Sequence, residues 1–245
     1  MTTSFHRLAN PARFQKFARR ALPWSWAVAV LGLGSGFVWG LALSPADYQQ
    51  GDTVRVMYVH VPAAWMAMAC YALMALLSAS FLVWKHQLAG IAALAAAPVG
   101  ACFTAIALIT GSLWGKPTWG TWWVWDARLT SVLVLFFLYL GYMALAGAFD
   151  DRLRGLRAAS LLALVGIINL PIIKFSVDWW NTLHQPASIL RAGGPSIHAS
   201  MLWPLAITAL GFAAFLVAIL LVRIRSELAL WRTEALMRRQ TRGVT

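Results

Sequence analysis

The sequence predicts an all-α, polytopic membrane protein with six transmembrane helices, and three observations support this prediction. The 245 residues are 60% hydrophobic and 11% charged, with a mean hydropathy of +0.69. A soluble domain of this length could not bury so much apolar surface, so part of the solvent must be lipid. Basic residues alternate between successive connections, and apolar runs of helical length recur. The predicted spans are about 23–43, 60–84, 90–114, 129–149, 158–177 and 200–222.

The placement of Lys and Arg predicts the orientation of these spans. Fifteen of the 20 basic residues lie in the tails and in the two short connections, and five lie in the three alternate segments. Because cytoplasmic segments are enriched in Lys and Arg, both termini and the two short connections are expected in the cytoplasm. The net charge of +12 is then a topology signal, and nucleic-acid binding is not expected. We expect one membrane domain over 1–245, with basic tails at 1–22 and 223–245.

Several chemistries are not expected. The two cysteines, Cys70 and Cys102, lie in apolar runs and form no C-x-x-C motif, which speaks against a disulfide framework, a thiol redox site or a covalent haem attachment. The stretch GSLWGKPT (111–118) has the wrong glycine spacing for a phosphate loop. No nucleophile–base pair with catalytic spacing is found in the sequence. The chain is therefore not expected to be an enzyme or to bind ATP itself.

The outer segment 115–128 and the residue just before it carry an unusual density of tryptophan. One explanation is an aromatic belt at the bilayer surface, although belt tryptophans are usually scattered singly. A second is a short amphipathic helix lying on the membrane over 119–125. A third is a platform for a large, flat, apolar ligand, oriented by Asp126 and Arg128. The crowding favours the platform. Its tryptophans are Trp114, Trp119, Trp122, Trp123 and Trp125.

The same segment carries a family resemblance. Its residues Trp119, Gly120, Trp123, Trp125 and Asp126 fit the W-G-x-x-W-x-W-D signature of the tryptophan-rich haem-handling proteins of cytochrome c maturation. The stretches VMYVHVPAAW (56–65) and SVDWWNTLHQP (176–186) resemble the two histidine segments that flank the signature in that family. The six-span plan and the length extend the resemblance over essentially the whole chain. In its number of spans and its length, the chain is similar to the smallest type of these haem-handling proteins, the haem exporter protein C family.

This resemblance implies a haem site at the outer face. His60 and His184 would be the two axial ligands of the iron of a transiently bound haem b, since neutral imidazole is the usual axial donor. The platform would consist of Trp114, Trp119, Gly120, Trp122, Trp123, Trp125 and Asp126. Arg55 and Arg128, and with less support Arg191 or Lys116, are candidates to pair with the haem propionates. Anchoring of the fourth span is the alternative role of Arg128. Asp126 is expected to pair with Arg128, to cap a helix or to orient a ligand histidine or an indole N–H.

The other histidines are expected to have no axial role. His6 lies in the N-terminal tail and His86 in the short turn after span two, where solvated histidines are common. His198 is on the outer side but lacks the aromatic context of His184, so we expect it to be structural or to support the site from outside. No histidine lies in the middle of a predicted span. This placement favours haem that is presented at the membrane surface over haem buried for electron transfer.

By the same resemblance, the chain would deliver haem to a periplasmic haem chaperone for cytochrome c biogenesis. The implied setting in the lipid bilayer is an ABC-type complex with an ATPase subunit, a second membrane subunit and a small single-span protein. The alternative is a permease subunit that transports haem or another apolar substrate across the bilayer. The spans contain few ionisable residues to line a polar path, which speaks against a hydrophilic substrate. A scaffold without a cofactor is a third hypothesis, and it leaves the placement of the histidines unexplained.

Overall fold

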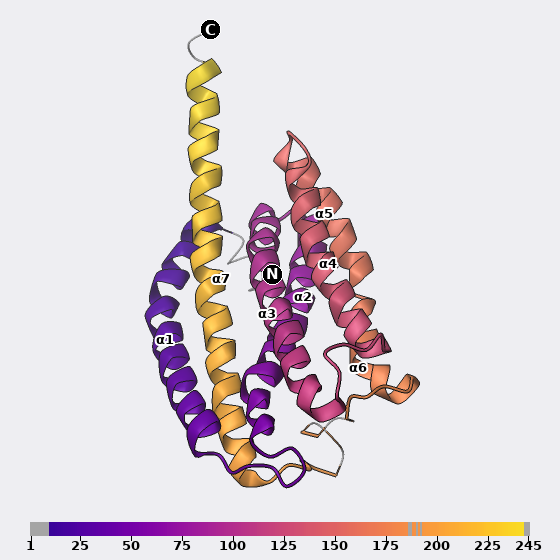
Figure 1. Ribbon diagram of the computed structural model, residues 1–245. Helices are drawn as coiled ribbons and strands as arrows, with labels where there is room; N and C mark the ends of the chain where they lie inside the picture. Colours follow the sequence, from indigo (N-terminus) through magenta and orange to yellow (C-terminus); the bar gives the residue numbers. More distant parts are fainter. Residues whose placement is uncertain (1–9, 186–187, 190, 192, 243–245) are drawn as a thin grey trace.

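The computed structural model describes residues 10–185, 188–189, 191 and 193–242, and these are mostly helical, with no strand among them. Figure 1 shows the helices α1 to α7 as a bundle. Helix α1 continues into a π-helical segment, Val38–Leu43, and a 3-10 helix, Asp52–Val56, precedes α2. The α-helices are α1 (Pro11–Phe37), α2 (Met57–Trp84), α3 (Gln87–Trp119), α4 (Ala127–Gly147), α5 (Arg152–Gly166), α6 (Asn169–Trp179) and α7 (Ala199–Arg242).

Six helical stretches of the described chain are long and apolar enough to cross a membrane, as the sequence predicts. The chain is therefore an all-α, multi-pass membrane protein. Helices α5 and α6 together form one of these stretches, since only two residues separate them. The six stretches are Pro11–Leu43, Asp52–Trp84, Gln87–Trp119, Ala127–Gly147, Arg152–Trp179 and Ala199–Met237.

The terminal helices are longer than the predicted spans. Helix α1 begins at Pro11, because the Asn10 side chain accepts hydrogen bonds from the backbone N–H groups of Ala12 and Arg13 and so caps the helix. At the other end of the chain, α7 continues to Arg242 and extends beyond the rest of the bundle (Figure 1). Much of both predicted tails is thus helical. Residues 1–9, including His6, lie outside the described part.

Helix α3 also runs further than predicted. The span was expected to end near residue 114, but the helix continues to Trp119, where Gly120 ends it with a left-handed φ of 77°. Trp114 and Trp119 therefore belong to the end of a helix. The short surface helix considered for 119–125 does not form, since residues 120–126 are irregular and α4 begins at Ala127.

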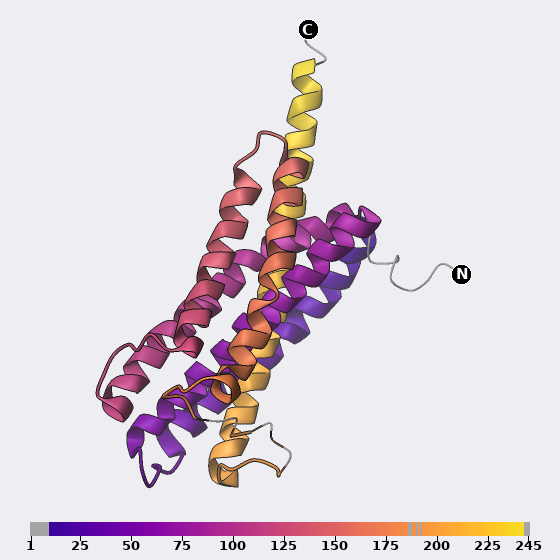
Figure 2. The same ribbon diagram turned by 90° about the vertical axis from the view of Figure 1, so that its right-hand side faces the viewer.

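The three longer connections gather at one end of the bundle. These are residues 44–51, 120–126 and the described part of 180–198, and in Figures 1 and 2 they lie at the lower end. The short turns α2–α3 and α4–α5 lie at the opposite end, together with the start of α1 and the end of α7. The fold thus brings the three motif-bearing segments of the sequence to the same end.

Helices α1 and α7 pack closely because small residues meet between them. A Cβ atom at Gly32 would lie 2.9 Å from the Cα atom of Gly211, and one at Gly36 would lie 2.9 Å from the Cα atom of Thr208. Only glycine allows the two backbones to approach this far. Internal packing accounts for this part of the glycine stripe in span one.

Substitution of Gly36 by leucine is expected to destabilise the bundle by roughly 1–3 kcal/mol, because the α7 backbone would have to move. The measurement is thermal unfolding of the purified protein in detergent. Gly34→Leu is the matched control, since nothing lies within 4 Å of a Cβ at that position on the same helix. Equal effects of the two substitutions would contradict the close α1–α7 contact.

Candidate haem site

The two candidate ligand histidines come from different elements and meet the end of the same helix. His60 lies in the first turn of α2, and His184 lies in the connection after α6. The His60 ring packs edge-on against Trp114, with centroids 5.7 Å apart, and the His184 ring against Trp119, with centroids 4.9 Å apart. Helix α3 thus places one tryptophan beside each histidine.

The hydrogen bonds of His60 determine which ring nitrogen is protonated. Its Nδ1 lies 3.1 Å from the hydroxyl oxygen of Thr110. That hydroxyl has one proton, which it donates to the carbonyl oxygen of Ile106 at 2.6 Å. Nδ1 must therefore be the donor and Nε2 the unprotonated nitrogen. No described residue hydrogen-bonds to Nε2, so its lone pair is free to bind a metal.

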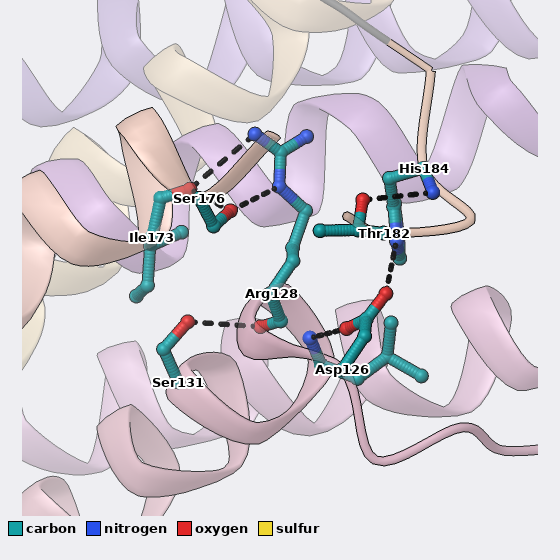
Figure 3. A network of polar contacts seen from close by, with 8 residues as sticks. Asp126, Arg128, Ser131, Ile173, Ser176, Thr182 and His184 are labelled. Atoms are coloured by element: carbon teal, nitrogen blue, oxygen red, sulfur yellow. Dashed lines mark hydrogen bonds and ion pairs between the residues drawn. The ribbon is translucent and has the colours of Figure 1, made fainter. Parts of the chain in front are cut away.

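His184 faces a carboxylate in the same way. Its Nδ1 lies 3.6 Å from Oδ2 of Asp126 (Figure 3). Both atoms are buried and have no hydrogen-bond partner among the described residues, so each is the nearest polar atom available to the other. Burial lowers the pKa of His184 below its ordinary value, although the attraction of Asp126 opposes this effect. The ring is therefore neutral at pH 7, which is the form that binds iron.

Asp126 combines two of the roles expected for it. Its Oδ1 accepts a hydrogen bond from the backbone N–H of Leu129 at 2.7 Å and caps α4, while Oδ2 faces His184. The cap fixes the carboxylate at the start of the helix, so the same contact that begins α4 aims the second oxygen at the histidine. The third expected role, an ion pair with Arg128, is not formed within the described structure.

Arg128 is occupied by the end of α6. Figure 3 shows its Nε donating to the hydroxyl of Ser176 at 3.0 Å and one terminal nitrogen donating to the carbonyl oxygen of Ile173 at 3.3 Å. The same nitrogen lies 3.3 Å from the carbonyl oxygen of Lys174. The Ile173 carbonyl also accepts a hydrogen bond from the Ser176 hydroxyl at 2.9 Å, so the guanidinium adds charged donors to a polar cluster in α6. The contacts join the start of α4 to the end of α6, and they favour the anchoring role over propionate pairing.

The other candidate cations differ in how far they are engaged. Arg55 forms an ion pair with Asp52 at 3.0 Å and donates to the carbonyl oxygens of Leu41 and Ser44. Lys116 donates to the carbonyl oxygen of Gly120 and lies 5.9 Å above the centre of the exposed Trp122 ring. Arg191 is exposed on the outer connection. Lys116 and Arg191 are therefore the better placed of these cations to approach a solvent-facing anion.

The five tryptophans of the signature region form two sets. Trp114 and Trp119 are half-buried beside the histidines, and the indole N–H of Trp114 donates to the side chain of Gln50 at 2.8 Å. Trp122 and Trp125 are 55% and 75% exposed, and Trp123 packs edge-on against Trp125 at 5.5 Å. The first set positions the histidine rings, and the second offers a large apolar surface at the rim of the bundle.

Sequence reasoning missed three residues that support the site: Thr110, Gly111 and Gln50. Gly111 lets the His60 ring approach α3, because a Cβ there would lie 3.1 Å from Cε1 of the ring. The sequence did offer one signal for Thr110, since it is a polar residue one helical turn before Trp114. His198, in contrast, lies outside this cluster: it is exposed, and its Nδ1 is 2.8 Å from the Ser200 hydroxyl. His86 is in the α2–α3 turn at the opposite end.

The arrangement fits a flat metalloporphyrin. Porphyrin nitrogens take four positions on an iron, so a protein supplies at most two, and this site offers two histidines. Nδ1 of each histidine has a polar neighbour, as is usual for ligand histidines. Aromatic rings provide broad contact area for such a ligand. In the described residues, no three or more His, Cys, Asp and Glu side chains are grouped to hold a bare metal ion.

Comparison with known proteins gives a consistent result. The family model described as "Heme exporter protein C" matches residues 4–239. Similar proteins of that name occur in Bradyrhizobium diazoefficiens, with 55% identity over 95% of this chain and 88% of the relative, and in Escherichia coli K12, with 47% identity over 98% and 99%. The protein of that name from Paracoccus denitrificans is 44% identical over 98% of this chain and its own full length. The chain therefore belongs to the heme exporter protein C family, whose members are haem-handling membrane proteins of cytochrome c maturation.

Proposed function

We propose that this protein holds haem b at the periplasmic face of the bacterial inner membrane and presents it to a periplasmic haem chaperone. His60 and His184 bind the iron through Nε2, and the signature tryptophans contact the porphyrin. The observation that carries the proposal is the end of α3, which sets Trp114 against one histidine and Trp119 against the other. Two histidine donors thereby meet one aromatic helix end.

The distribution of charge supports a periplasmic site. The histidines and tryptophans lie at the end of the bundle that carries the three longer connections, and this end is poor in Lys and Arg. The opposite end carries the short turns and both described chain ends, where most basic residues are found. Under the positive-inside rule, the basic end is cytoplasmic. Both termini would then be in the cytoplasm.

The exposed tryptophans support presentation of the haem rather than burial. Trp122 and Trp125 are largely exposed at the rim, so a porphyrin in contact with them would have an edge open to the periplasm. An open edge is what transfer to a second protein requires. The family's name of exporter is consistent with an ABC-type complex, in which a separate ATPase subunit, a second membrane subunit and a small single-span protein surround this chain.

The test is an absorption spectrum of the purified protein, oxidised and reduced, followed by transfer in proteoliposomes. We expect a low-spin spectrum of non-covalent haem b, and transfer to the chaperone added on the site-bearing side only. A well-folded protein without haem would support the scaffold hypothesis instead. Haem that appears inside sealed vesicles containing this chain alone would support the permease hypothesis.

A further inference from the structure

We propose that the two histidines are unequal ligands: His184, oriented by the Asp126 carboxylate, is the stronger donor, and His60, oriented by the Thr110 hydroxyl, is the weaker. The bond between the iron and His60 is then the one that opens when haem leaves. Thr110 is assigned as a positioning residue. This inference rests on the proposed function, in which both histidines bind iron.

The support of His60 is a neutral group. The Thr110 hydroxyl donates its proton to the Ile106 carbonyl and accepts from Nδ1 of His60 at 3.1 Å. Gly111, the next residue of α3, allows the ring to lie this close. The contact holds the Nδ1–H tautomer and fixes the ring plane, so Nε2 stays available. A neutral hydroxyl withdraws little of the Nδ1 proton, and it adds little electron density to Nε2.

The support of His184 carries a full negative charge. Oδ1 of Asp126 is used by the Leu129 backbone, so Oδ2 remains for Nδ1 of His184 at 3.6 Å. At this distance the contact is electrostatic and is longer than a hydrogen bond. The carboxylate is 5% exposed, so water screens the contact little. A carboxylate draws the Nδ1 proton more strongly than a hydroxyl and raises the basicity of the ligand.

The positions of the two histidines in the chain point the same way. His60 is part of α2, whose backbone is held by the helical hydrogen-bond ladder, so it cannot follow haem that moves outward. His184 lies in an irregular connection, which is less constrained. In the exchange, the lone pair of an incoming donor replaces Nε2 of His60 on the iron. The His60 ring leaves neutral, with Nδ1–H still bonded to Thr110, and no electron or proton is transferred.

The first measurement compares His60→Ala and His184→Ala. Each purified variant is loaded with ferric haem, and the rate of haem loss to excess apomyoglobin is followed by absorption. We expect haem loss from His184→Ala to be at least about tenfold faster than haem loss from His60→Ala, because only the weaker ligand, His60, remains in the first variant. Equal rates, or faster loss from His60→Ala, would overturn the inference. An unmodified protein that binds no haem would overturn the proposed function itself.

The second measurement isolates Thr110. The variant Thr110→Val keeps the side-chain size but removes the acceptor. Added imidazole should displace His60 at a concentration several-fold lower than in the unmodified protein, because the ring is no longer held in place. The midpoint potential should rise slightly, since the small donation of electron density through the hydroxyl is lost. Thr110→Ser should restore both values. Thr118→Val is the matched control, because Thr118 is exposed on the same helix and its hydroxyl bonds only to the Trp114 carbonyl among the described residues.

Asp126→Asn should raise the potential more than Thr110→Val does and should reduce the difference between the two histidine variants. If Thr110→Val changes neither imidazole affinity nor potential, Thr110 has only a packing role and the inference is wrong. A larger rise in potential for Thr110→Val than for Asp126→Asn would contradict the proposed ranking of the ligands.

Discussion

Replacement of both His60 and His184 by alanine is expected to abolish haem binding and to leave the helical fold intact. The iron loses both protein ligands, and the remaining aromatic surface offers contact area without a coordinate bond. Changes to groups that only support a ligand typically cost 10–100-fold in metal affinity. The loss of both ligands themselves should therefore exceed about 100-fold. The measurement is titration of the detergent-purified variant with haemin, followed at the Soret band.

The fold should survive this double substitution because neither histidine belongs to the main core. That core consists of apolar and tyrosine side chains such as Tyr71, Tyr139 and Leu135, which lie deeper in the bundle. Circular dichroism of the variant should match that of the unmodified protein. His198→Ala is the control, since His198 is an exposed histidine at the same end of the bundle, and this variant should keep the Soret absorption of bound haem. An unchanged Soret absorption in the double variant would place the iron ligands elsewhere.

Spectral rescue adds a second criterion. Free imidazole supplied to the double variant should restore a low-spin spectrum if the aromatic surface still holds the porphyrin. Failure of rescue, with the helical content retained, would mean that the histidines contribute most of the haem affinity. Either result distinguishes the contribution of the signature tryptophans to haem binding from that of the histidines. A loss of binding alone does not distinguish the two contributions.

The spans could be predicted from the sequence because each is a local property. About 20 consecutive apolar residues are enough to define a membrane helix, whatever lies beside it. The end of α3 was misjudged for a similarly local reason. The apolar run is interrupted by Gly115, Lys116 and Pro117, but all three residues lie within the helix, and Gly120 provides the termination.

The partner of each supporting residue could not be predicted, because the two residues of each pair are far apart in the sequence. Gln50 receives the indole N–H of Trp114, which is 64 residues away, and the hydroxyl that orients His60 is 50 residues away, on Thr110. A motif specifies which residues occur in a segment, but not which side chains of another helix face them. The pairing of Asp126 with His184 was among the open alternatives for that carboxylate, and its geometry required the fold.

Substitution of Arg128 by methionine is expected to lower the free energy of unfolding by roughly 2–4 kcal/mol and to weaken haem binding as well. Methionine has a similar length but no donor, so the Ser176 hydroxyl and the carbonyls of Ile173 and Lys174 lose the guanidinium, and only the hydrogen bond from Ser176 to Ile173 remains. The end of α6 would then detach from α4. Since α6 leads into the connection that carries His184, the histidine would lose its position relative to Asp126.

Unfolding in detergent and haemin titration together measure both effects. Arg128→Lys should recover part of the stability, because an ammonium group reaches one acceptor but cannot form the planar fork. Arg154→Met is the control for loss of a basic residue. Arg154 is exposed and pairs only with Asp151, at 3.6 Å, in the described structure, so little change is expected.

Haem dimethyl ester distinguishes the anchoring role of Arg128 from direct pairing with a propionate, because its propionates carry no charge. If Arg128 acts by holding α6, the methionine variant should bind haem and its dimethyl ester with the same fold loss. If the guanidinium instead binds a propionate, the loss should be confined to haem, and the unmodified protein should already bind the ester poorly. The three acceptors on α6 already occupy Nε and one terminal nitrogen of the guanidinium, and we therefore expect equal losses.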